Sequence, residues 1–209
     1  EHIEQLKHFA NSDLFKNNIV AQRIFVHTKT SETEFYLLNS DYKNALSKIR
    51  SAENAIAKQQ LQIEPYHLMY FYYLHAITLF SVGNLNESLI HVNRVLNNFT
   101  KTDRPTVYAA TELLNVIVHF ELGNYVTVSS LAKHTLNLNR KTKVFTGAEE
   151  FLLQTILRII STKKIEPELV NKLLNAVQTN ISRLKSNLKF QTEEPLNFYA
   201  KWLDAKLMG

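Results

Sequence analysis

The stretch SVGNLNESL, Ser81 to Leu89, decides the fold because it separates two strongly apolar segments at one of only four glycines in 209 residues. Apolar residues recur at three- and four-residue intervals over 66–82, which predicts an amphipathic helix. Gly83 follows it and is suited to the left-handed conformation that ends a helix. Asn84, with Glu87 three positions later, has the form of a capping box. The stretch therefore predicts the turn of a helical hairpin.

The same turn recurs along the chain. Gly123 lies forty residues after Gly83, and Tyr42 lies forty-three residues before Leu85. A weaker fourth copy occupies 162–170. A period of 40–43 residues, each made of two helices, predicts a helical-repeat solenoid.

Proline marks the starts of the predicted helices. A proline suits the first helical turn because the N–H it lacks has no helical partner there, and this predicts helix starts at Pro65, Pro105, Pro167 and Pro195. The predicted elements are a leading helix near 1–11, hairpins at about 14–61, 65–99, 105–139 and 147–189, and a capping helix at 195–207. We expect one continuous domain over 1–209.

Composition bounds the class of protein. A hydrophobic fraction of 45% and a charged fraction of 21% are typical of a folded, soluble chain, and no apolar run approaches the ~20 residues that span a bilayer. The absence of cysteine excludes disulfides, thiolate metal sites and cysteine nucleophiles. We expect a cytoplasmic protein with no membrane contact. Because the chain begins at Glu1 rather than Met, we also expect that an upstream segment has been removed.

The hairpins resemble tetratricopeptide repeats. The second hairpin has residues of suitable size at that family's large, small, aromatic and turn positions, namely Tyr72, Ala76, Leu79, Gly83, Leu85 and Ser88. The whole chain also resembles the C-terminal part of longer bacterial helical-repeat proteins of this type. The resemblance implies an all-α, right-handed superhelix of antiparallel helix pairs, a TPR-like α-solenoid, in which the first helix of each repeat lines a concave groove.

The aromatic segment YHLMYFYYLHAITLF, residues 66–80, has two interpretations. It is either a helix packed on both sides inside the solenoid or part of a groove that binds a peptide. By the family's geometry, the groove residues are Tyr70, Tyr73, Ile77, Phe80, Leu113, Ile117, Phe120 and Glu121. Tyrosine suits a peptide groove because it combines a broad apolar ring with a hydroxyl.

The sequence predicts neither catalysis nor a bound cofactor or metal. Phosphate-binding loops, nucleophile elbows and zinc-protease motifs are absent. Metal ligands on one helix lie three or four residues apart, whereas His67 and His75 are eight apart, and His91, His119 and His134 each stand alone. His119 takes an inward position, either as a hydrogen-bonded core residue or as a groove residue.

Residues 133–189 carry eleven Lys and Arg against four Glu, an excess of +7. Arg140, Lys141, Lys143, Lys163 and Lys164 form a predicted basic surface at turns. Such cations either interact with helix dipoles and solubilise the surface or bind an acidic partner. We do not expect nucleic acid, because the chain has no known nucleic-acid-binding motif.

These observations predict a protein-interaction module or scaffold that binds a peptide or helix of a partner protein in its concave groove. The alternative is the sensor or regulatory half of a longer protein whose upstream region binds DNA or is enzymatic. Self-association through the open end of the first hairpin is a further expectation, because the end of a solenoid exposes a face that stacks in longer arrays.

Overall fold

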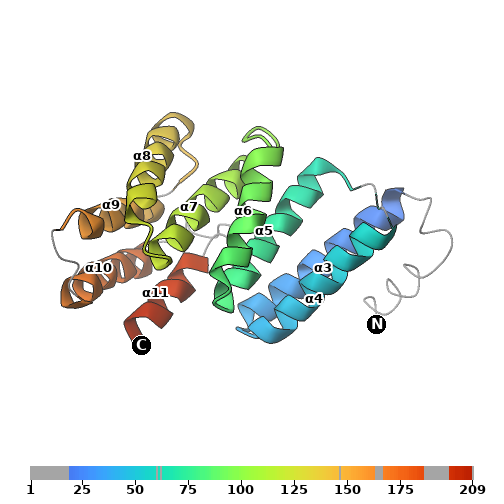
Figure 1. Cartoon of the computed structure of the whole chain (residues 1–209), viewed down its shortest axis with the longest axis horizontal. Coiled ribbons are helices and arrows are strands. Elements are labelled where there is room, and N and C mark those ends of the chain that lie inside the picture. The colour runs from blue at the N-terminus through green and yellow to red at the C-terminus, as the bar shows by residue number, and fades with distance from the viewer. Residues whose placement is uncertain are drawn as a thin grey trace. The chain divides into compact units, whose positions relative to one another are not determined.

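The structure, a computed structural model, describes residues 19–59, 61, 63–145, 147–162, 167–185 and 198–208 (Figure 1). Within these ranges it contains nine α-helices and no strand, which confirms the all-α class. The chain divides into two compact units, residues 1–104 (unit 1) and 105–209 (unit 2), and each is described by itself.

The described residues of unit 1 form two helical hairpins (Figure 1). Its helices are α3 (Ile19–Leu38), α4 (Tyr42–Gln59), α5 (Pro65–Ser81) and α6 (Leu85–Asn98). Helix α5 packs against both α3 and α4 as well as against its own partner α6. The buried cluster at this junction comprises Val26, Ile49, Ala52, Phe71 and Leu74.

Three hairpin turns share one hydrogen-bonding pattern. At the end of α5, the Gly83 N–H donates to the Phe80 carbonyl at 2.9 Å and the Asn84 N–H donates to the Leu79 carbonyl at 2.9 Å, which is a Schellman motif. The turn after α7 repeats both bonds around Gly123, and the turn after α3 repeats them around Ser40. Each central residue is left-handed, with φ of 78°, 73° and 59° for Gly83, Gly123 and Ser40. The recurring turn predicted from the sequence is thereby confirmed at three positions.

The capping box after Gly83 forms in part. The Asn84 side chain accepts a hydrogen bond from the Glu87 N–H at 3.4 Å, as predicted. The Glu87 carboxylate, however, accepts from the Asn84 side-chain amide rather than from its backbone N–H. It also pairs with Arg50 of α4 at 2.6 Å. Glu87 therefore links α6 to α4 as well as capping its own helix.

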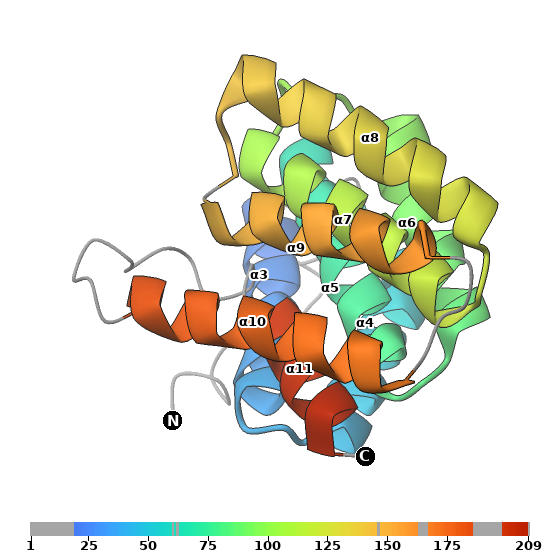
Figure 2. The ribbon, with the colours of Figure 1, turned by 90° about the vertical axis from the view of Figure 1, so that its left-hand side faces the viewer.

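Unit 2 contains α7 (Pro105–Glu121), α8 (Tyr125–Thr142), α9 (Gly147–Ile160), α10 (Pro167–Lys185) and α11 (Phe198–Met208). Helices α7 and α8 form one hairpin, α9 and α10 pair with each other, and α8 contacts α9. Figure 2 shows α11 crossing α10, on which it packs. Tyr199 of α11 is fully buried, and its hydroxyl donates to Glu149 of α9 at 2.8 Å. Helix α11 is thus tied to more of unit 2 than the preceding helix alone.

The predicted helix boundaries agree with the structure to within a few residues. Pro65, Pro105 and Pro167 are the first residues of α5, α7 and α10, as predicted, whereas Pro195 and the predicted leading helix at 1–11 lie outside the described residues. Helix α8 is longer than predicted and ends at Thr142 instead of Asn139. The superhelical arrangement and the single continuous domain stay predictions. No described helix combines the length and apolarity needed to cross a membrane.

Candidate functional site

The predicted groove residues of α5 are mostly buried. Tyr73 is fully buried, and Ile77 and Phe80 are buried as well. Tyr70 is half-buried, its hydroxyl donates to Glu34 of α3, and the Arg104 guanidinium lies 4.2 Å from its ring centroid. Burial, with the Glu34 hydrogen bond as the next cause, raises the pKa of Tyr70, so the phenol stays neutral at physiological pH.

The predicted groove residues of α7 divide into two groups. Leu113 and Ile117 are fully buried. At the end of the helix, Phe120 and Glu121 contact α11. Trp202 stands edge-on to the Phe120 ring at a centroid distance of 6.4 Å, and its indole N–H donates to Glu121 Oε1 at 2.9 Å. Lys206 donates to the other oxygen of the same carboxylate at 2.7 Å.

These positions bear on the two interpretations of the aromatic segment. Residues 73–80 are buried without interruption, so α5 is enclosed on every side along this length, as the filled-interior interpretation requires. A peptide groove along α5 stays a prediction. On α7 the predicted residues Phe120 and Glu121 do contact a helix, which is α11 of the same chain.

The predicted basic surface is described only in part. Arg140 and Lys141 are exposed in the last turn of α8, and Lys143 follows with a left-handed φ of 52°. Cations here face the negative end of the helix dipole, which accounts for their position without a partner. Lys163 and Lys164 lie outside the described residues.

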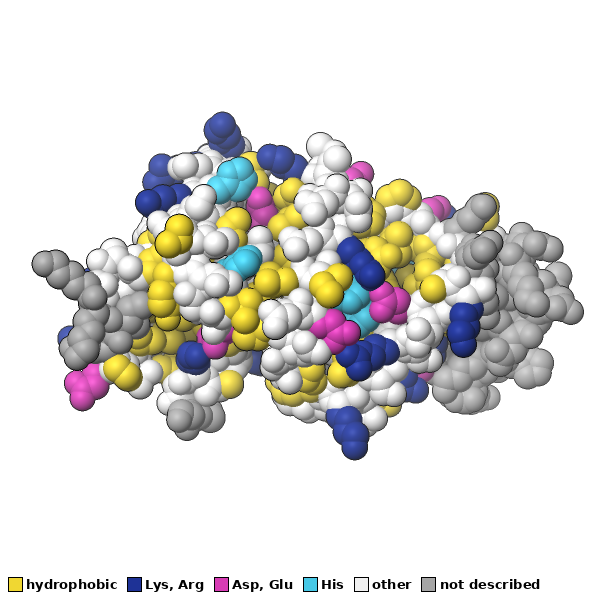
Figure 3. All heavy atoms as spheres, in the orientation of Figure 1, with side chains coloured by type: hydrophobic (Ala, Val, Ile, Leu, Met, Phe, Trp, Pro, Cys, Tyr) yellow, Lys and Arg dark blue, Asp and Glu magenta, His cyan; other side chains and the backbone are white. Residues whose placement is uncertain are grey.

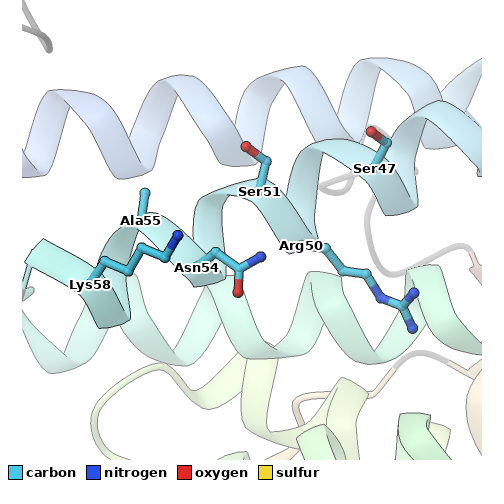
Figure 4. Close-up of a pocket in the computed structure, with 6 residues that line it drawn as sticks. All are labelled: Ser47, Arg50, Ser51, Asn54, Ala55 and Lys58. Atoms are coloured by element: carbon cyan, nitrogen blue, oxygen red, sulfur yellow. The ribbon is translucent and has the colours of Figure 1, made fainter.

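An open hollow of about 630 Å³ lies along the outer face of α4 (Figure 4). The lining residues all come from this one helix: Ser47, Arg50, Ser51, Asn54, Ala55 and Lys58. Small-molecule pockets are concave and predominantly apolar, whereas this surface is shallow and lined mostly by polar side chains. The hollow therefore does not favour a small-molecule site.

Among the described residues, a buried histidine pair that sequence reasoning missed brings together side chains able to bind a metal ion. The rings of His75 on α5 and His91 on α6 have centroids 3.8 Å apart and an interplanar angle of 32°. Helices α5 and α6 approach closely beside the two rings: the buried Ser88 hydroxyl of α6 donates to the Ala76 carbonyl of α5 at 2.8 Å. The expectation that His91 stands alone was wrong, because it considered spacing along one helix and not across a hairpin.

A carboxylate from a third helix completes this group. Glu53 of α4 directs Oε2 toward His75 Nδ1 at 3.5 Å, and its Oε1 pairs with Arg94 of α6. One ligand atom each from Glu53, His75 and His91 lies within 4.8 Å of the other two. Over α4, α5 and α6, Figure 3 shows histidine, acidic and basic side chains gathered together on the surface. We call Glu53, His75 and His91 the Glu-His-His cluster.

The imidazoles of this cluster are neutral. Burial, followed by the nearby His91, Arg50 and Arg94, lowers the pKa of His75 to about 3. Burial is also the largest cause that lowers the pKa of His91, to about 4, against the opposing effect of Glu53. At pH 7 each ring therefore keeps a nitrogen lone pair.

Three of the four ring nitrogens of these imidazoles lack a hydrogen-bond partner. Both ring nitrogens of His75 and Nδ1 of His91 are buried without one, although the two residues are only 1% and 4% exposed. An unsatisfied buried polar group costs about 1–3 kcal/mol, so buried side-chain atoms of this kind are uncommon.

Two further histidines, His119 and His134, are partly or largely exposed. His119 is half-buried and its Nδ1 lies 3.2 Å from the Asn124 side-chain nitrogen, so it is a hydrogen-bonded residue at a helix end. Burial lowers the pKa of His119. The His134 side chain is 69% exposed, with Glu112 at 3.7 Å.

No protein-family model, curated protein or solved structure matches the chain.

Proposed function

We propose that the chain is a TPR-like helical-repeat module that binds a helix of a partner protein. The observation that carries the proposal is the seat of α11 at the end of α7, where Phe120 and Glu121, two residues chosen from the repeat pattern, hold a helix. Antiparallel hairpins with a common turn support it, because stacked repeats present long surfaces lined by variable side chains.

The chemistry of this contact specifies the partner. One carboxylate, Glu121, accepts from an indole N–H and from an ammonium group on residues four apart, which share one face of a helix. The indole is 8% exposed, so it supplies apolar burial as well as a hydrogen bond. A partner helix with an aromatic residue and a cation at this spacing fits the same position.

The proposal is tested by peptide binding in trans. A labelled peptide of residues 193–208 is titrated into the full chain and into a Trp202→Phe, Lys206→Met variant, with fluorescence anisotropy as the measurement. The variant keeps apolar bulk but removes both donors to Glu121. We expect at least tenfold tighter peptide binding to the variant, because a helix tethered in the same chain competes at a high effective concentration.

Two controls make the test specific. A peptide with alanine at the tryptophan and at the second lysine should bind weakly, and adding Glu121→Gln to the variant should reduce affinity at least fivefold. Circular dichroism verifies that each variant is folded. Absence of peptide binding to the variant, or equal affinity after Glu121→Gln is added, contradicts the proposal.

A further inference from the structure

The Glu-His-His cluster lies outside the helix-binding contact and has features of its own. Its three side chains come from α4, α5 and α6, so the fold and not local sequence brings them together. His75 and His91 are almost fully buried, and three of their ring nitrogens have no hydrogen-bond partner. Buried imidazoles without partners are expected where a ligand completes their coordination.

The distances suit a metal ion. With metal–ligand bonds of about 2.0–2.2 Å, neighbouring ligand atoms of a tetrahedral zinc site lie about 3.4 Å apart. Glu53 Oε2 and His75 Nδ1 are 3.5 Å apart, which matches that separation. The full set of ligand atoms lies within 4.8 Å, so reaching 3.4 Å needs a shift of up to about 1.4 Å, together with a turn of one imidazole out of the stacked arrangement so that its lone pair faces the ion.

The surroundings of the cluster also fit a cation. Arg94 pairs with Glu53 Oε1 and leaves Oε2 directed at the histidine, which is how outer partners orient a metal-binding carboxylate. The charges of Arg50 and Arg94 are balanced by those of Glu87 and Glu53, with which they pair. A divalent ion therefore enters surroundings with no net positive charge.

The ligand types narrow the choice of metal. Two imidazoles and one carboxylate form a set found at zinc sites with an open fourth position, and imidazole also binds copper, nickel and cobalt. With no cysteine in the chain, no thiolate competes for such an ion. Calcium and magnesium prefer all-oxygen ligands and do not fit.

We propose that Glu53, His75 and His91 bind one first-row divalent transition-metal ion of the zinc class, which links α4, α5 and α6 of unit 1. Glu53 is the ligand nearest to solvent, with a side chain 31% exposed, and it provides the route of entry. The remaining coordination position is available to water or to a donor from a partner.

The test is titration of the full chain, stripped with a chelator, with Co²⁺ and Zn²⁺ at pH 7.5. Co²⁺ absorption reports coordination geometry, and competition against a chromophoric chelator gives the Zn²⁺ affinity. We expect one ion per chain and at least tenfold weaker binding in His75→Gln, His91→Gln and Glu53→Gln.

A second histidine pair in unit 1 provides a matched control. His27 and His67 have ring centroids 4.4 Å apart, and His67 Nε2 lies 3.5 Å from Glu64, but His27 and Glu64 are exposed. His67→Gln should keep the parent affinity. If a buried histidine variant fails to fold, the partly exposed Glu53→Gln still carries the test, because Zn²⁺ should raise the unfolding temperature of the parent and not of this variant.

Each outcome either supports or contradicts the proposed metal site. Binding of one ion per chain that is lost in the Glu53, His75 and His91 variants and kept in His67→Gln supports the site. Absence of chelator-competitive binding, or binding that is lost in His67→Gln alone, overturns it. Neither result depends on whether a partner helix binds at Glu121.

Discussion

Left-handed residues end several helices of this chain, and they differ in how well their side chains tolerate that conformation. Gly83 and Gly123 carry no Cβ, whereas Ser40 and Lys143 hold φ values of 59° and 52° with one. For residues other than glycine the left-handed region costs about 1–2 kcal/mol. Ser40 adopts the left-handed conformation in place of a glycine, and the first hairpin therefore has the same turn hydrogen bonds as the others.

This difference predicts opposite effects of two substitutions. Gly83→Ala should destabilise the chain by about 1 kcal/mol, and Lys143→Gly should stabilise it by a similar amount. Space is not the cause, since a Cβ at Gly83 meets no atom within 4 Å. Urea unfolding followed by circular dichroism measures both free energies of unfolding.

Gly147→Ala is the control for this pair. Gly147 also has open space around its Cβ position, but its φ is not positive, so alanine should leave stability unchanged or raise it by up to about 1 kcal/mol. Equal effects at Gly83 and Gly147 would contradict the backbone explanation.

At the scale of elements, a small buried residue fixes the distance between α5 and α6. Ser88 is fully buried and donates to the Ala76 carbonyl at 2.8 Å. Ser88→Ala removes one hydrogen bond and should cost about 1 kcal/mol. Ser88→Leu inserts bulk into the contact and should cost about 1–3 kcal/mol from overpacking, on top of the lost bond.

Thermal and urea unfolding rank the two Ser88 variants. Ser129 of α8 is the comparison, because it is half-buried and follows the buried Val128. If the close approach of α5 and α6 causes the loss in Ser88→Leu, Ser129→Leu should lower the free energy of unfolding less than Ser88→Leu does. A Ser88→Leu variant as stable as Ser88→Ala would show that the helices separate without cost.

The elements also show what the sequence predicts and what it leaves open. Proline starts and glycine turns were predicted because their backbone preferences are local. The histidine pair required the pairing of two helices, although a signal was present: His75 lies eight residues before Gly83 and His91 eight residues after it. Positions at similar distances from a hairpin turn lie at a similar height in the two helices, so this symmetry is a signal that the two histidines can meet. Glu53, from a different hairpin, carries no comparable signal.

The burial of the aromatic segment was open for a related reason. A stripe of apolar residues predicts one buried face of a helix, but α5 is buried on all sides over 73–80. Whether polar positions between the stripes are also covered depends on helices distant in sequence, as with the buried His75 and Thr78. Periodicity alone does not contain that information.

At the scale of the whole molecule, buried neutral histidines link the folding equilibrium to pH. The native pKa values of about 3 for His75 and about 4 for His91 lie below the value near 6.5 of an unfolded chain. Between these limits the unfolded state binds more protons than the native state, so stability rises with pH. The contribution is fully present above pH 6.5 and is lost as pH falls toward the native pKa values.

We therefore expect the metal-free chain to lose stability on acidification from pH 6.5 to 4.5, by up to about 1.4 kcal/mol per pH unit for each histidine. Urea unfolding in the presence of a chelator, repeated across this range, measures the slope. A His75→Leu, His91→Leu variant should have a shallower slope, because leucine binds no proton in either state. His134→Gln, at a side chain 69% exposed, is the control and should keep the parent slope, because the substitution leaves the buried pair unchanged. Equal slopes for the parent and the double variant would mean that the buried rings take up protons in the native state, and the neutral pair described above would be wrong.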